Sequence, residues 1–247
     1  MLSSIKGNPF NWSLRKWQYY YEDYPDKAYS VIAESDGRIL GHFGFHSVQF
    51  GEFNAMLPNA AIIHPSTRNL TILSKILELV DYVCQKEKVD FIWAPANPGF
   101  TAVLNKFFKW IKIGYVQFVD VESLDLRDFE DRRRFHYSED WYQWKFGGKK
   151  DTYIQDFEFN DIVHHQLLKS EGKKKLISAK ELGYDKLNCW APSGYSKEQP
   201  EGWAQPISVK ALNPNLPESI LDINNWFLEM GDSDAFEWMA KPYLRQK

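Results

Sequence analysis

The stretch that most constrains the fold of this 247-residue chain runs from residue 60 to residue 86. It begins with a short apolar run, passes through the polar loop HPSTRN, and continues with helical spacing. Apolar residues that recur every three or four positions predict an amphipathic helix. The recurring positions are Ile72, Ile76, Leu79, Val80 and Val83, with Leu73, Leu77 and Cys84 on the adjoining stripe.

The loop between this strand and this helix is a candidate anion site. A strand that turns directly into a helix leaves unpaired backbone N–H groups at the helix start. Together with the helix dipole, these groups attract an anion, most often a phosphate. Most strand–loop–helix turns bind nothing, however, so the loop alone leaves both interpretations open.

The residues before the loop predict a helix and three antiparallel strands. Residues 12–23 carry aromatic and apolar side chains at helical spacing. Residues 29–34 and 39–50 are apolar runs joined by the tripeptide Ser-Asp-Gly at 35–37. Asp-Gly between two such runs is a strong hairpin signal. Residues 53–63 can then form the third strand, which leads into the loop.

Beyond the long helix the pattern predicts a strand, a helix and a strand. Residues 91–94 form a short buried strand, and Asn97-Pro98 opens a helix with Asn at the N-cap and Pro at the first helical position. Gly114 ends this unit, and residues 115–124 follow as another strand. This order predicts a mixed α/β fold, in which the crossover through the central helix places two strands side by side in parallel.

The second half of the chain repeats landmarks of the first half. Residues 17–21 and 142–146 share the pattern aromatic–Gln–aromatic–x–aromatic, and FIWAP at 91–95 is echoed by NCWAP at 188–192. Ordered landmarks of this kind indicate an internal repeat. The second copy is shorter by about the length of the loop and much of the long helix. The sequence therefore predicts two halves, residues 1–126 with the anion loop and residues 127–247 as a truncated copy.

Composition excludes several classes of protein. The net charge of −3 gives no electrostatic footprint for nucleic acid, so no such partner is expected. With two cysteines there is neither a disulfide framework nor a cysteine metal motif, and Cys84 fits a small apolar filler. No apolar run is long enough to span a bilayer, and the first residues lack a signal-peptide core. The expected location is the cytoplasm.

No metal site is expected. His164 and His165 are adjacent, so on a strand they point to opposite faces and cannot chelate one ion together. Asp232 and Asp234 lie in the tight turn Gly-Asp-Ser-Asp and lack further oxygen ligands nearby in the sequence.

Several motifs in a fixed order carry a resemblance to a known family. They are DGRILGHFGF, HPSTRNLTILSKIL, FIWAPANPGF and the closing GDSDAF. In this order they resemble the GNAT superfamily of acyl-CoA-dependent N-acyltransferases, and within it the tandem type of bacterial polysaccharide biosynthesis. The resemblance covers roughly residues 10–125 well and roughly 138–236 more loosely. It implies an α/β fold with a mixed, GNAT-like sheet and a second, truncated GNAT-like half.

The resemblance implies acetyl-CoA as co-substrate and assigns cofactor-binding positions. Backbone groups of Ile62 and Ile63 would pair with the pantetheine arm, and Asn97 would lie near the cofactor, in addition to capping its helix. Backbone N–H groups of the loop would hold the pyrophosphate. The loop positions are Arg68, Asn69, Leu70, Thr71 and Ile72.

Two departures from the family pattern affect these assignments. The family's two loop glycines are Asn69 and Thr71 here, and a β-branched Thr adopts left-handed φ poorly. The residues before Trp12 are too few for the superfamily's first strand and helix, so the acceptor wall is expected to be missing or supplied by the second half.

Acyl transfer to an amine needs a base and a donor for the developing oxyanion. His42 and His46 share one strand face and can titrate near neutrality, although each also fits a histidine satisfied within the sheet. Glu52 is a turn residue that can line an acceptor cleft or simply face solvent. A backbone N–H at Ile63 or His64 is the oxyanion candidate.

The function implied by the resemblance is direct acyl transfer, most simply of acetyl, within a ternary complex. The acceptor would be an amino sugar, free or nucleotide-linked, or another small amine, and a homodimer is a candidate assembly. One alternative is a catalytically degenerate GNAT-like binding module for a sugar or a protein partner. Another is a Fem-like aminoacyl transferase, which the acidic net charge disfavours.

Overall fold

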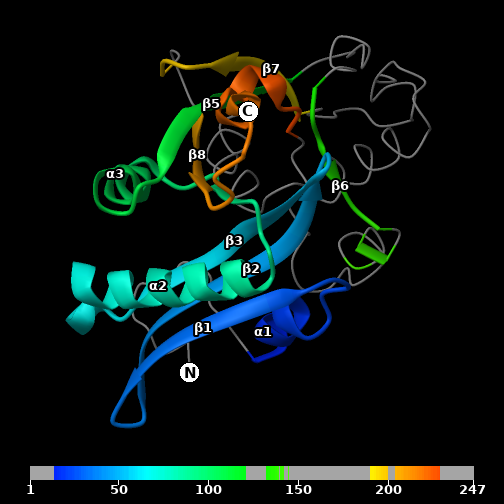
Figure 1. Cartoon of the computed structure of the whole chain (residues 1–247). Coiled ribbons are helices and arrows are strands. Elements are labelled where there is room, and N and C mark those ends of the chain that lie inside the picture. Colours follow the sequence, from blue (N-terminus) through cyan, green and yellow to red (C-terminus); the bar gives the residue numbers. More distant parts are fainter. Residues whose placement is uncertain are drawn as a thin grey trace. The chain divides into compact units, whose positions relative to one another are not determined.

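The computed structural model of the chain contains two compact units (Figure 1). The first unit contains residues 14–93 and 210–216. The second contains the described residues between 94 and 209 and from 217 onward. In all, the structure describes residues 14–120, 132–138, 140–141, 144, 190–199 and 204–228.

An antiparallel meander forms most of the sheet of the first unit. Strands β1 (Ala28–Ser35), β2 (Arg38–Phe50) and β3 (Phe53–Ile63) pair in sequence order. Asp36 and Gly37 connect β1 to β2 with φ of 50° and 70°. Two consecutive positive φ values match the twist of a tight hairpin and explain the Asp-Gly dipeptide. The predicted hairpin and third strand are confirmed.

Helices α1 (Leu14–Tyr21) and α2 (Leu70–Lys86) cover opposite faces of this meander. A Cβ on Gly41 would lie 2.7 Å from the Ile76 side chain of α2, whereas a Cβ on Gly44 would lie on Tyr21 of α1. Odd and even positions of β2 thus face different helices, as the period of two in a strand requires. In Figure 1, α2 runs along the sheet.

The buried stripe of α2 is rotated slightly from the predicted one. Leu79 is 48% exposed, so it lies outside the core, and the adjoining stripe supplies most of the contact with the sheet. Cys84 is fully buried, and this burial raises the pKa of its thiol to about 12, as expected of an apolar filler. The buried residues are Leu73, Ile76, Leu77, Val80 and Cys84.

After α2 the chain returns as β4 (Phe91–Ala94), which lies parallel to β3. The predicted parallel crossover is therefore confirmed. Together, antiparallel and parallel pairings give the mixed α/β sheet that the sequence predicts. No helix in the described ranges combines the length and the apolar surface that a bilayer crossing needs.

The second unit begins with α3 (Pro98–Phe107) and the strand β5 (Ile111–Asp120). β5 pairs antiparallel with β8 (Gln205–Ala211) and with β7 (Trp190–Ser196). The prediction that Gly114 ends the segment before this strand is wrong. Gly114 lies inside β5, at a register shift against β8. The other elements are β6 (Phe135–His136), β7 (Trp190–Ser196), β8 (Gln205–Ala211), and the short 3-10 helices η4 (Glu218–Leu221) and η5 (Ile223–Asn225).

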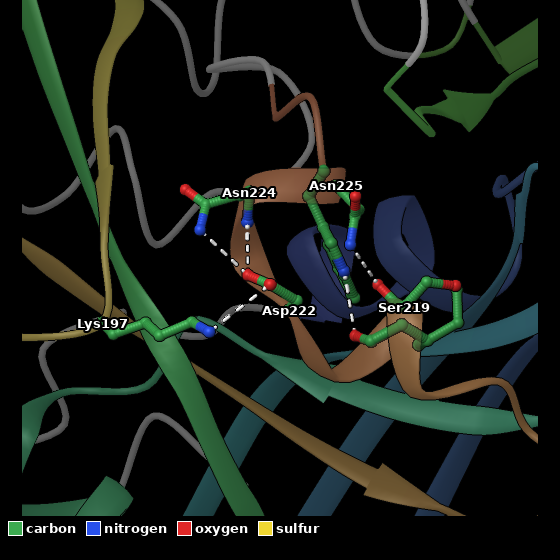
Figure 2. A network of polar contacts seen from close by, with 7 residues as sticks. Lys197, Ser219, Asp222, Asn224 and Asn225 are labelled. Atoms are coloured by element: carbon green, nitrogen blue, oxygen red, sulfur yellow. Dashed lines mark hydrogen bonds and ion pairs between the residues drawn. The ribbon is translucent and has the colours of Figure 1, made fainter.

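A polar network caps η5 in the second unit (Figure 2). The Asp222 carboxylate accepts hydrogen bonds from the backbone and side-chain amides of Asn224 and pairs with Lys197 at 3.4 Å. These partners, the Asn224 backbone first, lower the pKa of Asp222. Asn225 donates to the Ser219 carbonyl. Directly after η5, Trp226 forms a bridge with Arg133.

Several predictions fall on residues outside the described ranges. They include much of the repeated landmarks at 142–146 and 188–192, the paired histidines at 164–165 and the closing turn at 231–234. The proposed division into halves at residue 126 stays a prediction for the same reason.

We expect Gly44→Ala to destabilise the fold. The added Cβ would lie 1.6 Å from the Tyr21 hydroxyl oxygen, so ring and strand must separate. Overpacking of this kind costs roughly 1–3 kcal/mol. Urea unfolding measures the change in the free energy of unfolding. Gly99→Ala is the control, because its Cβ would meet nothing closer than 3.4 Å. Equal stability of the two variants would contradict the packing described here.

Candidate functional site

The turn between β3 and α2 is fixed by its own side chains. It contains the 3-10 helix η2 (Pro65–Thr67), which His64 caps by accepting the Ser66 N–H at Nδ1, 3.2 Å away. The Ser66 hydroxyl oxygen lies 2.7 Å from the same nitrogen. The Thr67 hydroxyl lies within hydrogen-bond reach of the carbonyls of His64 and Leu40. The turn is therefore attached to the start of β2.

The backbone N–H of His64 is one of the groups that attach the turn to β2. It donates to the Leu40 carbonyl at 2.7 Å. The expectation that the His64 N–H could stabilise an oxyanion is therefore wrong for this residue, which leaves the Ile63 N–H as the other candidate.

Helix α2 begins with a side-chain cap that engages one of the predicted anion-binding amides. Asn69 is the N-cap, and its Oδ1 accepts the Ile72 N–H at 3.0 Å. The Leu70 and Thr71 amides donate to no group in the described part of the chain. The side chains of Asn69, Leu70 and Thr71 are exposed. Two donors at the positive end of the helix dipole thus face solvent.

Asn69 and Thr71, where the GNAT pattern has glycines, do not strain this turn. Asn69 is extended, with φ −140° and ψ 167°, and Thr71 lies in the first turn of α2. Neither belongs to the described non-glycine residues with positive φ. The left-handed conformation that a β-branched residue disfavours is therefore not required here.

The backbone groups of β3 alternate between pointing toward β2 and pointing away from it. This alternation, the hydrogen-bond phase of β3, decides which groups stay outside the β2 ladder. In an antiparallel pair, successive residues direct N–H and C=O alternately toward the partner strand and away from it. His64 faces β2, because its amide donates to Leu40. The register is unbroken from there back to Ala60, so Ile62 also faces β2. Ala61 and Ile63 consequently direct their backbone groups to the other side.

On that other side, β4 accompanies only the beginning of β3. The parallel register contains Ala55 and Met56 but no later residue of β3. Pro58, two residues further on, has no N–H to donate, which is a physical reason for the ladder to end there. Ala61 and Ile63 are opposite Phe43 and Gly41 in the β2 register, but their N–H and C=O groups point away from β2, and the β4 register does not extend to them in the described sheet. They form an unpaired strand edge that an extended, amide-containing ligand can join.

The strand edge separates the two residues of β3 that were predicted to bind the cofactor. Ile63 lies at the edge, whereas Ile62 is engaged with β2. Ala61 was not identified from the sequence, although Pro58 and Asn59 inside an apolar strand indicate a bulge, and a bulge shifts the phase of a strand. Only the pairing register reveals on which side each residue lies.

The two candidate catalytic histidines are enclosed beneath α1. His42 is 2% exposed, and its Nε2 lies 2.9 Å from the Ser30 hydroxyl oxygen. Burial lowers the pKa of His42 to about 4, so it does not titrate near neutrality. His46 is 5% exposed and stacks on the ring of Tyr24, with centroids 3.9 Å apart.

Glu52 does not lie close to these histidines. It is exposed in the turn between β2 and β3, ten residues along the chain from His42. A strand rises about 3.3 Å per residue, so the two lie roughly 30 Å apart along β2. The three predicted catalytic residues do not form one cluster.

Asn97 belongs to the second unit and is an N-cap, as its sequence predicts. Its Oδ1 accepts the Phe100 N–H at 2.9 Å, and Pro98 follows at the first helical position. A role near a cofactor stays a prediction for this residue.

Comparisons with known proteins add a distant structural likeness. No protein-family model and no curated protein matches the sequence. The fold is similar to an acetyltransferase of the GNAT family from Staphylococcus aureus Mu50, with 17% identity over 48% of this chain and 74% of that one, and a TM-score of 0.33. It is also similar to a chain of the NatC complex bound to Gag peptide and CoA, with 16% identity, coverage of 44% and 70%, and a TM-score of 0.34. At these values the likeness establishes no activity for this chain.

We expect the stability of the protein to fall with acidification between pH 6.5 and pH 4. His42 has a pKa of about 4 when folded and an ordinary value of 6.5 when exposed. The unfolded state therefore binds more protons in this window, and stability is lost as the pH falls through it. The difference between the two pKa values is equivalent to roughly 3 kcal/mol.

Denaturant unfolding at several pH values measures this dependence. His42→Gln is the control, because Gln can still bond Ser30 but does not titrate. The variant should show a flatter pH profile than the parent chain, and identical profiles would count against the assignment to His42.

Proposed function

We propose that this chain is an acyl-CoA-dependent N-acyltransferase that uses acetyl-CoA. The observation that carries the proposal is the pair of amides at Leu70 and Thr71, which have no partner among the described residues and which the short turn through η2 connects to the edge of β3. A diphosphate and an amide-containing arm, joined in one molecule, match these two features in their chemistry.

The diphosphate would bind at the start of α2. The amides of Leu70 and Thr71 donate to phosphate oxygens, and the helix dipole favours the negative charge. The Thr71 hydroxyl supplies another donor. Arg68 is exposed and adds a guanidinium, which recognises phosphate with paired N–H groups. These donors would take the place of the Ile72 N–H, which already donates to the side chain of Asn69.

The pantetheine arm would lie along β3 as an additional strand. Its amide groups can pair with the N–H and C=O of Ala61 and Ile63, which directs the thioester along the sheet. In the reaction, the acceptor nitrogen attacks the thioester carbonyl and the carbon–sulfur bond breaks. The coenzyme A thiolate leaves, and the nitrogen loses a proton. The assignments of His42, His46 and Glu52 to this proton transfer stay predictions.

The acceptor is proposed to be a small amine such as an amino sugar, on the basis of the resemblance in sequence. The second candidate function is a degenerate binding module, which the enclosure of both candidate histidines favours. The two functions share the cofactor site and differ in turnover. Release of free thiol from acetyl-CoA in the presence of a panel of amino sugars separates them.

We expect acetyl-CoA to bind and to raise the melting temperature. A ligand at one hundred times its Kd stabilises the folded state by about 2.7 kcal/mol. For a chain of this size that corresponds to a shift of roughly 5 °C or more. Isothermal titration measures the affinity, and thermal unfolding measures the shift. Absence of both effects at millimolar acetyl-CoA would refute the proposal.

We expect Asn69→Asp to weaken acetyl-CoA binding without weakening the fold. Asp caps a helix about as well as Asn, so the cap of α2 is retained. The new carboxylate, however, lies next to the amides of Leu70 and Thr71 and repels a diphosphate. A repulsion of about 1.4 kcal/mol is a tenfold loss of affinity. Titration calorimetry measures it, and thermal unfolding checks the stability.

Gln85→Glu is the matched control for this charge. It makes the same amide-to-carboxylate change at an exposed position near the other end of α2. Affinity should stay within about twofold of the parent value, since the two positions are roughly 24 Å apart along the helix. A similar loss in both variants would indicate a general charge effect and no local anion site.

A further inference from the structure

Three side chains join α1 to the point where β3 leaves its regular register. The Tyr21 hydroxyl donates to Oδ1 of Asn59 at 2.8 Å. The amide nitrogen of Asn59 lies 2.6 Å from Nε2 of His46. That same Nε2 lies 2.8 Å from the Tyr20 carbonyl oxygen. One chain of polar contacts thus runs from the end of α1 through β2 to Asn59.

Asn59 is the extra residue of a β-bulge. Gly44 of β2 is opposite Ala60, and the next residue of β2 is opposite Pro58, so Asn59 has no partner in the register. A bulge inserts one residue into a strand, and a shift of one residue exchanges its two sides. Without the bulge, Ala60 and Ile62 would occupy the sides that Ala61 and Ile63 occupy.

The surroundings of the bulge leave little room for another arrangement. Gly44 lies directly beneath the Tyr21 hydroxyl and close to Asn59, where an added Cβ would be 1.6 Å and 2.7 Å from their oxygen atoms. His46 is buried, with Tyr24 stacked on its ring. Side chains so closely packed hold a single geometry.

We propose that Tyr21, His46 and Asn59 are positioning residues that hold this bulge in place. By fixing the phase of β3, they direct the backbone groups of Ala61 and Ile63 to the side where the acyl-CoA arm would pair. This inference rests on the proposed function for the identity of the ligand. The three residues act through the backbone of β3 and do not touch the reacting atoms.

The test compares two substitutions that each remove one hydroxyl group. Tyr21→Phe removes the donor to Asn59. Tyr24→Phe is the matched control, because its hydroxyl lies 3.1 Å from the Ser47 carbonyl of β2 and not at the bulge. Asn59→Leu removes the other end of the contact. All variants are made in the full-length chain.

The first measurement is hydrogen exchange by mass spectrometry without ligand. Tyr21→Phe and Asn59→Leu should accelerate exchange of the amides that face β2, those of Ala60, Ile62 and His64, about tenfold, which corresponds to a local loss of about 1.4 kcal/mol. Tyr24→Phe should leave those amides within about twofold of the parent chain. Equal exchange in the two tyrosine variants would overturn the proposal.

The second measurement is the Kd for acetyl-CoA. Tyr21→Phe and Asn59→Leu should each weaken binding about tenfold, and the double variant should bind no more weakly than Asn59→Leu alone, because both remove one contact. Tyr24→Phe should bind within about twofold of the parent chain. Faster exchange with unchanged affinity would overturn the positioning role.

The two measurements also separate this inference from the proposed function. If the parent chain does not bind acetyl-CoA, the proposed function fails, and the positioning role for that ligand fails with it. The exchange data then still decide whether Tyr21 and Asn59 hold the bulge.

Discussion

The rest of the first unit depends on the hydrogen-bond phase of β2, the strand that bonds to β1 on one side and to β3 on the other. Its backbone groups alternate between the two neighbours, and its side chains alternate between the two helices. Gly41 and Gly44 stand where α2 and α1 approach the strand too closely for a side chain. The run GHFGFH is therefore explained by close packing on both faces of one strand.

The same alternation leads to the proposed site. The bulge at Asn59 shifts the phase of β3, Pro58 removes a donor from the β4 side, and the strand continues past the end of its parallel partner. An unpaired edge results, followed within a few residues by the start of α2. Each feature is ordinary by itself, but in this order a strand edge outside the described hydrogen-bond ladders leads, through a short turn, into the positive end of a helix dipole.

Several elements could be predicted because their causes are local. Asp36 and Gly37 adopt the positive φ that a tight hairpin needs, and Asn97-Pro98 caps α3 through contacts within three residues. Predictions failed where a distant contact decides the outcome. Gly114 lies inside β5 because of its pairing with β8, and Leu79 is exposed because the contact with the sheet selects the neighbouring stripe.

The sequence by itself determined the order of strands and α-helices from α1 to β5, the cap of α3, and the loop that forms a candidate anion site. Turn chemistry and hydrophobic period depend on residues that are close together in the sequence, so they can be recognised without a structure. Only the tertiary structure decided that His42 and His46 are enclosed, that Glu52 lies at the far end of β2, and that Ala61 shares an edge with Ile63. The burial of a side chain and the direction of a strand's backbone groups depend on partners dozens of residues away. A local sequence pattern does not identify those partners.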